Sequence, residues 1–171
     1  VWRAKGYRGP IDVIPQFGVD PDMFAPCVPN STPERPFTIG YVGRMIPEKG
    51  IDDLLNATAR LHGQWRVLLI GGGPLRANLS TLAAKLGISD RVEFRDQVPS
   101  TQMPAQYHDI DALALPSRTQ ANWKEQFGRV LIEAMASGVP VIGSDSAAIP
   151  DVIGGTGLIF PEGDVSALTS H

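Results

Sequence analysis

Two basic side chains beside an expected helix start are the first candidates for chemistry in this sequence. Arg44 and Lys49 lie in the segment GRMIPEKG, which is bounded by Gly43 and Gly50. Glycines at both ends let the backbone bend tightly, and two cations beside a helix N-terminus favour an anion, most commonly phosphate. A solvated surface loop that happens to carry two cations is the alternative interpretation of this segment.

Two acidic residues, Glu125 and Glu133, flank the expected start of another helix near Gly128. A carboxylate beside a buried helix needs hydrogen-bond donors, and the hydroxyl groups of a ligand can supply them. A ligand with phosphate in its middle and hydroxyl groups at both ends, such as a sugar nucleotide, suits this arrangement. Solvated helical carboxylates are the alternative. Trp123, just before these residues, is either a lid over such a site or a surface anchor.

Short apolar segments alternate with amphipathic ones along most of the chain. Strands are expected at 11–15, 37–42, 67–70, 91–94, 112–115, 139–142 and 156–160, and helices at 48–62, 75–86, 103–108, 127–137 and 164–171. This alternation predicts an α/β fold with a parallel sheet covered by helices on both faces. Ligands of such sheets bind at the carboxyl ends of the strands, where the loops 43–50, 71–74, 98–102 and 117–128 are expected.

The glycine-rich turn at 71–74 does not have the G-x-G-x-x-G spacing of a dinucleotide site, so a nicotinamide cofactor is disfavoured. It is interpreted either as a tight turn between a strand and a helix or as a place where backbone approaches a ligand closely. The three histidines, His62, His108 and His171, are expected to be structural or solvated. No metal site is expected, because no acidic pair has the spacing of metal ligands.

Composition narrows the class of protein further. The 15 basic and 18 acidic residues give a net charge of −3, which provides no general attraction for nucleic acid or an anionic membrane. A hydrophobic content of 43% is ordinary for a globular protein. The single cysteine, Cys27, excludes an internal disulfide and fits a reducing compartment. No apolar run approaches the ~20 residues that span a bilayer, and a cytoplasmic location is expected.

Taken together and in order, these motifs resemble the donor-binding C-terminal domain of GT-B fold glycosyltransferases, in particular family 4 (group 1). The resemblance extends from about Ile11 to Leu168. It is carried by Gly43-Arg44 with Lys49-Gly50, Pro116-Ser117, Glu125 with Phe127-Gly128, and Glu133-Ala134-Met135-Ala136 followed by Gly138, Pro140 and Val141. The fold that it implies is a Rossmann-like parallel sheet forming one half of a GT-B enzyme.

The resemblance also implies a role for each group of residues. Arg44 and Lys49 would hold the pyrophosphate of the donor, Glu133 would accept from the ribose hydroxyls, and Glu125 would contact the transferred sugar. Backbone near Val98 would face the base. Arg44, Lys49 and Glu125 form the implied catalytic set, and the implied donor-binding residues are Gly43, Arg44, Lys49, Val98, Glu125, Phe127, Gly128, Arg129, Val130 and Glu133.

The activity that follows from the resemblance is transfer of a hexose from a UDP- or GDP-sugar to an acceptor hydroxyl, with retention of configuration and without metal or other cofactor. Residues 1–36 would form a proline-rich lead-in and residues 37–171 the donor domain, with its C-terminal helix truncated. The acceptor site, and any membrane contact, would belong to an N-terminal domain that this chain lacks. The chain alone is therefore expected to bind donor without efficient transfer. Alternatives are a non-catalytic nucleotide-binding module and a related GT-B enzyme such as a nucleotide-sugar epimerase.

Overall fold

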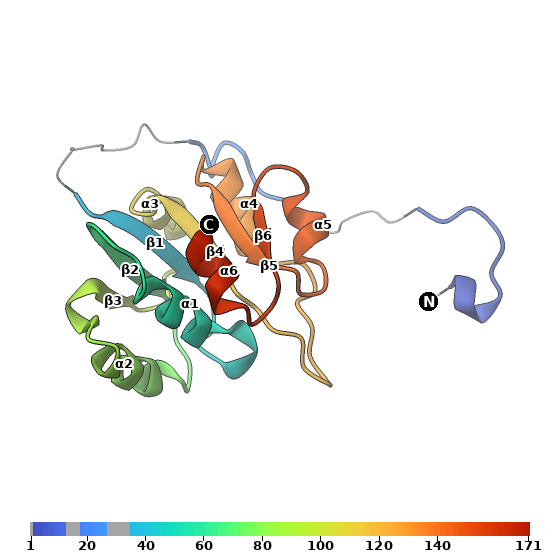
Figure 1. The fold of residues 1–171 in the computed structure, drawn as a ribbon. Helices are drawn as coiled ribbons and strands as arrows, with labels where there is room; N and C mark the ends of the chain where they lie inside the picture. The colour runs from blue at the N-terminus through green and yellow to red at the C-terminus, as the bar shows by residue number, and fades with distance from the viewer. Residues whose placement is uncertain (1, 13–17, 27–34) are drawn as a thin grey trace.

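A six-stranded parallel sheet forms the centre of the molecule in the computed structural model, which describes residues 2–12, 18–26 and 35–171 (Figure 1). The strand order is β3-β2-β1-β4-β5-β6, and every pairing is parallel. The strands are β1 (Phe37–Val42), β2 (Trp65–Ile70), β3 (Val92–Arg95), β4 (Ala112–Leu115), β5 (Val141–Ser144) and β6 (Leu158–Phe160). The predicted α/β class and parallel sheet are confirmed.

The central strands are apolar because both of their faces are covered. All four residues of β4 are buried, as are five of the six residues of β2. β1 pairs with β2 along its whole length, from Phe37 opposite Trp65 to Val42 opposite Ile70. Its pairing with β4 contains only Ile39–Ala112 and Gly40–Leu113. The sheet therefore consists of two halves, β1–β3 and β4–β6, which meet along a short seam.

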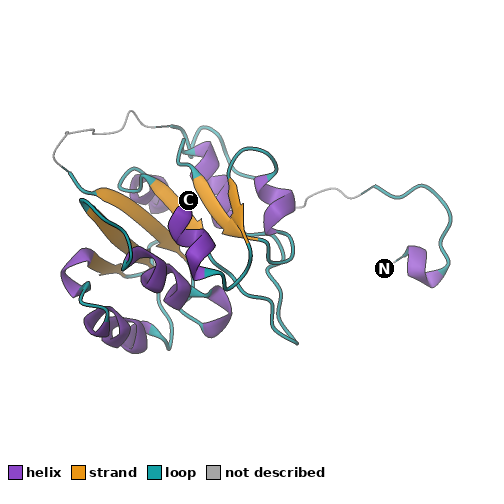
Figure 2. Cartoon of the chain, viewed as in Figure 1, coloured by secondary structure: helices purple, strands orange, loops and turns teal. Residues whose placement is uncertain are grey.

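Helices cover the two faces of this sheet in two groups (Figures 1 and 2). α1 (Ile51–Thr58), α2 (Arg76–Lys85) and α6 (Val165–Ser170) lie on one face. The other face carries α3 (Met103–Tyr107), α4 (Arg129–Ala136) and α5 (Ile149–Ile153). Single 3-10 turns are η1 (Arg3–Lys5), η2 (Pro47–Lys49), η3 (Ser89–Arg91) and η4 (Ser100–Gln102). Both faces of the sheet are thus buried, as expected.

The first long helix begins later and ends earlier than the sequence predicts. The expected range was 48–62, but Gly50 has a φ of 60°, a left-handed conformation that separates η2 from α1. Lys49 therefore lies on a separate 3-10 turn rather than on the helix. After Thr58 the backbone tightens, because the N–H groups of Arg60 and Leu61 bond carbonyls three residues earlier.

α4 also starts later, at Arg129 instead of Phe127, because Gly128 takes a left-handed conformation with a φ of 76°. The next strand, expected at 139–142, is β5 at Val141–Ser144. Pro140 has no N–H to donate to a neighbouring strand, so the strand begins after it. These shifts move the ends of the elements and leave their order unchanged.

Other boundaries differ by smaller amounts, and one helix was not predicted. β2 begins at Trp65 and not 67, β3 is shifted by one residue from 91–94, and β6 begins at Leu158 and not 156. α2, α3 and α6 lie within the expected ranges, and the Asp164 carboxylate caps α6 by accepting from the Ala167 N–H. α5 was missed because its five residues include a proline and are too few to establish helical periodicity.

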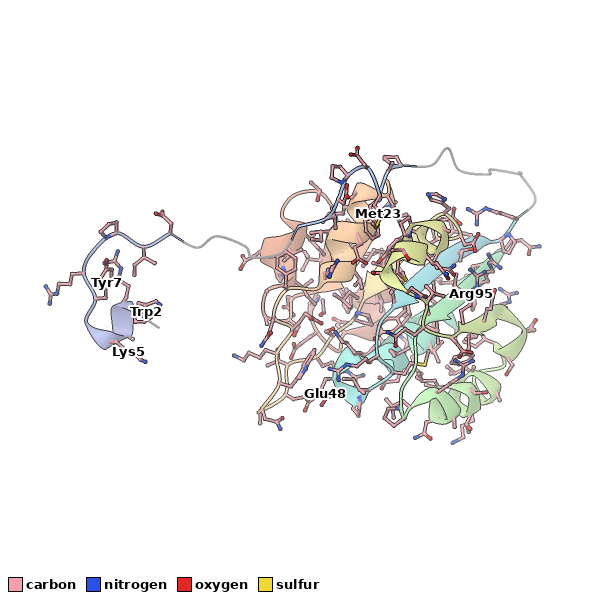
Figure 3. The ribbon with its side chains drawn as sticks, turned by 180° about the vertical axis from the view of Figure 1, so that it is seen from behind. Trp2, Lys5, Tyr7, Met23, Glu48 and Arg95 are labelled. Carbon is pink, nitrogen blue, oxygen red and sulfur yellow. The ribbon has the colours of Figure 1, made fainter. Side chains whose placement is uncertain are left out.

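The segment before β1 is not wholly outside the domain. Phe24 is buried, and its ring meets the ring of Tyr107 edge to face with 6.1 Å between centroids. Figure 3 shows Met23 next to the folded domain, whereas Trp2, Lys5 and Tyr7 lie away from it. Ile11 and Asp12 are not in a strand; the rest of the strand expected at 11–15, and Cys27, lie outside the described residues.

Candidate functional site

Turns that follow β1 and β2 pack directly against each other at the carboxyl end of the sheet. A Cβ atom on Gly71 would lie 2.1 Å from the carbonyl oxygen of Gly43, so only glycine allows this approach. The N–H of Met45 donates to the carbonyl of Gly72 at 2.8 Å. The glycine-rich turn is therefore a tight structural turn that also forms the wall of a cavity.

That cavity, which we call the glycine-loop cavity, has a volume of about 250 Å³. It contains the predicted residue Val98 together with both glycine turns. Its lining residues are Val42, Gly43, Arg44, Ile70, Gly71, Gly72, Gln97, Val98, Ser100 and Met103. The walls are mostly apolar or bare backbone, which suits a flat, partly apolar group such as a nucleobase.

A second cavity of about 470 Å³ adjoins the first, and we call it the ion-pair cavity. The two cavities share Val42, Gly43 and Arg44. The ion-pair cavity is lined by Val42, Gly43, Arg44, Lys49, Asn122, Trp123, Lys124, Glu125, Gln126, Gly128, Arg129 and Val130. Its lining combines four cations with one buried carboxylate, so it can hold an anion and hydroxyl groups together.

Lys49 and Glu125 form the ion pair for which this cavity is named. The lysine Nζ donates to Glu125 Oε2 at 2.5 Å, and the two side chains expose only 15% and 11% of their surface. The same carboxylate oxygen accepts from the hydroxyl of buried Ser117 at 3.0 Å. The ring of Trp123 lies 5.1 Å from the lysine Nζ, which places Trp123 over the cation and in the cavity wall.

Arg118 holds the two loops that carry this pair. Its backbone N–H donates to the carbonyl of Glu48 at 2.7 Å, next to Lys49. Its guanidinium donates to Asp53, which is buried, and to Asp52 at 3.0 Å. A bidentate guanidinium–carboxylate contact fixes direction as well as distance. The loop after β4 is therefore fastened to the start of α1.

Glu133 lies one turn into α4 and is almost completely buried. Its Oε2 accepts from the hydroxyl of Tyr107 at 2.8 Å. Its Oε1 lies 3.0 Å from Nε of Arg129, a side chain that is 57% exposed and lines the ion-pair cavity. Each carboxylate oxygen thus has a different neighbour, one from the core and one from the cavity.

Two buried tyrosines support these groups and remain protonated. Burial, with a smaller contribution from the negative charge of Glu125, raises the pKa of Tyr41 well above its ordinary value. Burial and the charge of Glu133 do the same to the pKa of Tyr107. The Tyr41 hydroxyl donates to the carbonyl of Arg44 at 2.8 Å, so it fixes the turn that presents Arg44 to both cavities.

Most of the residues proposed from sequence come together around the two cavities. Gly43, Arg44, Lys49, Val98, Glu125, Gly128, Arg129 and Val130 line one cavity or both. Phe127 and Glu133 do not; Glu133 is linked to the ion-pair cavity through Arg129. Tyr41 and Tyr107 were missed, because nothing in their local sequence reveals a hydroxyl that meets a distant residue. Gln97, which directly precedes Val98, was also missed, whereas Ser100 belongs to the loop expected at 98–102 but was not named as a site residue.

Another, larger cavity of about 730 Å³ lies elsewhere, toward the amino ends of the strands and next to α1 and α6. Its lining is largely apolar and includes Phe37, Trp65 and Leu168. We place the candidate site in the two smaller cavities because the cations and the buried carboxylate converge there. Among the described residues, no group of three or more His, Cys, Asp or Glu side chains is arranged to hold a metal ion. Within the same residues, no helix has the length and apolarity needed to cross a membrane.

The strand order 3-2-1-4-5-6 and the position of the cavities define a Rossmann-like domain. In such folds the chain leaves β1 and β4 in opposite directions, and the crevice between their carboxyl ends is where ligands bind. The chain belongs to the family of glycosyl transferases group 1, whose match covers residues 28–171. The resemblance inferred from the motifs is therefore confirmed.

Individual relatives agree with this assignment. The GDP-mannose-dependent alpha-(1-6)-phosphatidylinositol monomannoside mannosyltransferase of Mycolicibacterium smegmatis is 32% identical over 98% of this chain and 47% of its own length. Sucrose-phosphate synthase from Thermosynechococcus elongatus superposes with a TM-score of 0.76 at 30% identity, over 90% of this chain and 40% of that one.

HepE from Anabaena, solved in complex with UDP and glucose, gives a TM-score of 0.72 at 26% identity, over 80% of this chain and 37% of that one. The structural neighbours are GT-B glycosyltransferases, so the GT-B fold assignment is confirmed as well. The chain spans less than half the length of each of these three relatives.

Proposed function

We propose that residues 37–171 are the donor-binding domain of a retaining glycosyltransferase that transfers a hexose from a nucleotide sugar to an acceptor hydroxyl. The observation that carries this proposal is the ion-pair cavity, whose lining contains Arg44 together with Lys49 paired to a buried carboxylate, Glu125. A nucleotide sugar needs both kinds of group, cations for its diphosphate and an acceptor for its sugar hydroxyls.

The ligand would lie across the two cavities. The base would occupy the glycine-loop cavity near Val98, and the diphosphate would lie against Gly43, Arg44 and Lys49 where the cavities meet. The N-terminus of α4, with Phe127, Gly128, Arg129 and Val130, would add its positive end to the phosphate site. Glu133 would accept from the ribose hydroxyls, and Glu125 would contact the transferred sugar.

In this proposal the protein promotes transfer by stabilising the departing diphosphate. Arg44, Lys49 and the N-terminus of α4 are positioned before the reaction, and each such contact would contribute about 3 kcal/mol to the transition state. A diphosphate oxygen would help to remove the proton of the acceptor hydroxyl on the face where the leaving group departs, which retains the configuration. We propose that neither a metal nor another cofactor takes part.

Donors with either of two bases are compatible with the relatives. The mannosyltransferase is named for GDP-mannose, and HepE was solved with UDP. We therefore propose a UDP- or GDP-sugar as donor. The acceptor would be held by an N-terminal domain of the full-length protein, which would also carry any membrane contact. Residues 1–36 would lead into the donor domain, and this chain alone would bind donor without efficient transfer.

The proposal can be tested by titrating the 171-residue chain with UDP, GDP and ADP and the corresponding hexose conjugates in a calorimeter. We expect micromolar to millimolar binding of at least one uridine or guanosine ligand. The same titration with Lys49→Ala should show much weaker binding of the diphosphate. Absence of heat with every nucleoside diphosphate would contradict the proposal, and rapid sugar transfer by the chain alone would contradict the division of labour between the two domains.

A further inference from the structure

Tyr107 is a fully buried residue at the C-terminal end of α3, on the side of the sheet that carries α4. Its ring packs against the ring of Phe24 in a T-shaped arrangement, with 6.1 Å between centroids. Its hydroxyl lies 2.8 Å from Oε2 of Glu133 and 3.4 Å from the carbonyl oxygen of Val130. The hydroxyl of a core residue therefore points at one oxygen of a carboxylate beside the candidate site.

A buried phenol whose O–H group donates no hydrogen bond destabilises the folded state. Here the proton has two acceptors, and the carboxylate, at 2.8 Å, is the nearer and the charged one. Since burial and the charge of Glu133 both raise the pKa of Tyr107, the phenol stays a donor at physiological pH. Oε2 of Glu133 therefore accepts a hydrogen bond from a core residue, Tyr107.

The hydrogen bond between Tyr107 and Oε2 also fixes the direction of the other carboxylate oxygen, Oε1. Oε1 lies 3.0 Å from Nε of Arg129, a half-exposed side chain in the wall of the ion-pair cavity. A carboxylate anchored at one oxygen and held by a rigid ring cannot turn freely about its last side-chain bond. Oε1 is therefore kept toward Arg129, the side chain through which Glu133 is linked to the ion-pair cavity, and a ligand hydroxyl that displaces Arg129 would donate to this oxygen.

We propose that Tyr107 is a positioning residue, whose hydroxyl orients Glu133 so that Oε1 is presented to the ribose hydroxyls of the nucleotide. This inference rests on the proposed function, in which Glu133 is the ribose acceptor. It adds a residue from α3 to a site otherwise built from loops and α4. Tyr107 acts through Glu133 and contacts no part of the ligand.

The test compares ligands with and without ribose hydroxyls. A nucleoside diphosphate that the wild-type chain binds is titrated beside its 2′,3′-dideoxy counterpart, and the ratio of the two dissociation constants reports recognition of the hydroxyls. Hydrogen bonds to a charged group predict a wild-type ratio of about 10 to 100. In Tyr107→Phe the ratio should fall to within about threefold of unity, because ribonucleotide affinity drops while dideoxynucleotide affinity changes less than about twofold.

Tyr41→Phe is the matched control. It also removes a buried phenol hydroxyl, but that hydroxyl donates to the backbone of Arg44 rather than to Glu133. Its ratio should remain as in the wild type. If Tyr107→Phe fails to give a cooperative unfolding transition, Tyr107→Leu replaces it, since leucine also removes the hydroxyl and leaves Glu133 unchanged. The same collapse of the ratio is expected.

The outcomes separate the two proposals. A wild type that discriminates and a Tyr107→Phe variant that discriminates equally well would overturn the positioning role and leave the donor-binding function standing. A wild type that binds nucleoside diphosphates with a ratio near one would overturn the ribose role of Glu133 and with it the role of Tyr107. A wild type that binds no nucleoside diphosphate would overturn the proposed function itself.

Discussion

Lys49 and Glu125 are 76 positions apart in the sequence, yet their side chains form a largely buried ion pair in the wall of one cavity. The lysine comes from the loop after β1 and the glutamate from the loop after β4, so the pair joins the two halves of the sheet. Because both charges are largely withdrawn from water, separating them leaves unpaired buried charges and destabilises the folded state. An anion that attracts Lys49 must therefore be matched by new donors for Glu125, such as sugar hydroxyls.

The first prediction concerns the stability of this pair. Lys49→Ala should lower the free energy of unfolding by about 2 kcal/mol, because it removes the charged donor to buried Glu125 and leaves the neutral hydroxyl of Ser117 as a donor to the same oxygen. Glu125→Ala should cost a similar amount. In the double variant, the decrease in the free energy of unfolding should be smaller than the sum of the two single decreases by at least about 1 kcal/mol, as measured by urea denaturation. Simple additivity would show that the pair contributes nothing.

A second prediction separates the phosphate from the ribose side of the proposed site. Lys49→Ala should weaken the binding of a nucleoside diphosphate by about 10- to 100-fold and leave the binding of the unphosphorylated nucleoside nearly unaffected. Glu133→Ala should weaken both, because each contains the ribose hydroxyls. Calorimetric titration of the two ligands against each variant distinguishes these patterns. Equal affinity of wild type and Glu133→Ala for both ligands would refute the ribose assignment.

The third prediction follows from the raised pKa values of Tyr41 and Tyr107. Well below pH 10 each tyrosine is protonated in both the folded and the unfolded state, so neither makes stability depend on pH. As the pH rises through 10 the unfolded chain loses these protons while the folded state keeps them, and the fall in stability approaches about 1.4 kcal/mol per pH unit for each tyrosine. Tyr107→Phe should remove one such contribution from the slope measured by urea denaturation between pH 10 and 11.5. An unchanged slope in this variant would contradict the raised pKa.

The fourth prediction tests whether Arg118 fastens the two loops. Arg118→Lys keeps the charge but loses the bidentate contact with Asp53, so the free energy of unfolding should fall by about 1.5 kcal/mol. Affinity for a diphosphate should fall as well, although Arg118 lines neither cavity. The control is Arg76→Lys, whose partner Asp96 is 92% exposed, and it should change stability by less than about 0.5 kcal/mol. Equal effects of the two substitutions would argue against a special role for Arg118.

The order and type of the main elements could be predicted because apolar segments of strand length alternate with segments of helical period. Their ends could not. The glycines at positions 50 and 128 were recognised, but whether they begin a helix or interrupt the chain before it depends on a positive φ that tertiary packing imposes. α5 has too few residues for its period to be visible.

The candidate site was likewise only partly predictable from the sequence. Charged residues in loops at the carboxyl ends of strands were identifiable, because the topology brings those ends together. Contacts such as Tyr107 with Glu133 join residues from different helices across 26 positions, and the sequence near each tyrosine is that of an ordinary core residue. The hydrogen bond from the Tyr107 hydroxyl to the Glu133 carboxylate therefore could not be predicted from the sequence.

The short pairing of β1 with β4 has a mechanical consequence. β1 and β4 are in register at two residue pairs, with one more backbone hydrogen bond from the Asp111 N–H to the carbonyl of Thr38, while β1 and β2 are joined along their full length. The Lys49–Glu125 ion pair and the Arg118–Asp53 contact join the same two halves at the carboxyl ends of the strands. A nucleotide bound across both halves would be a further brace, so it should resist shearing of one half past the other and make the domain unfold under force as a single unit.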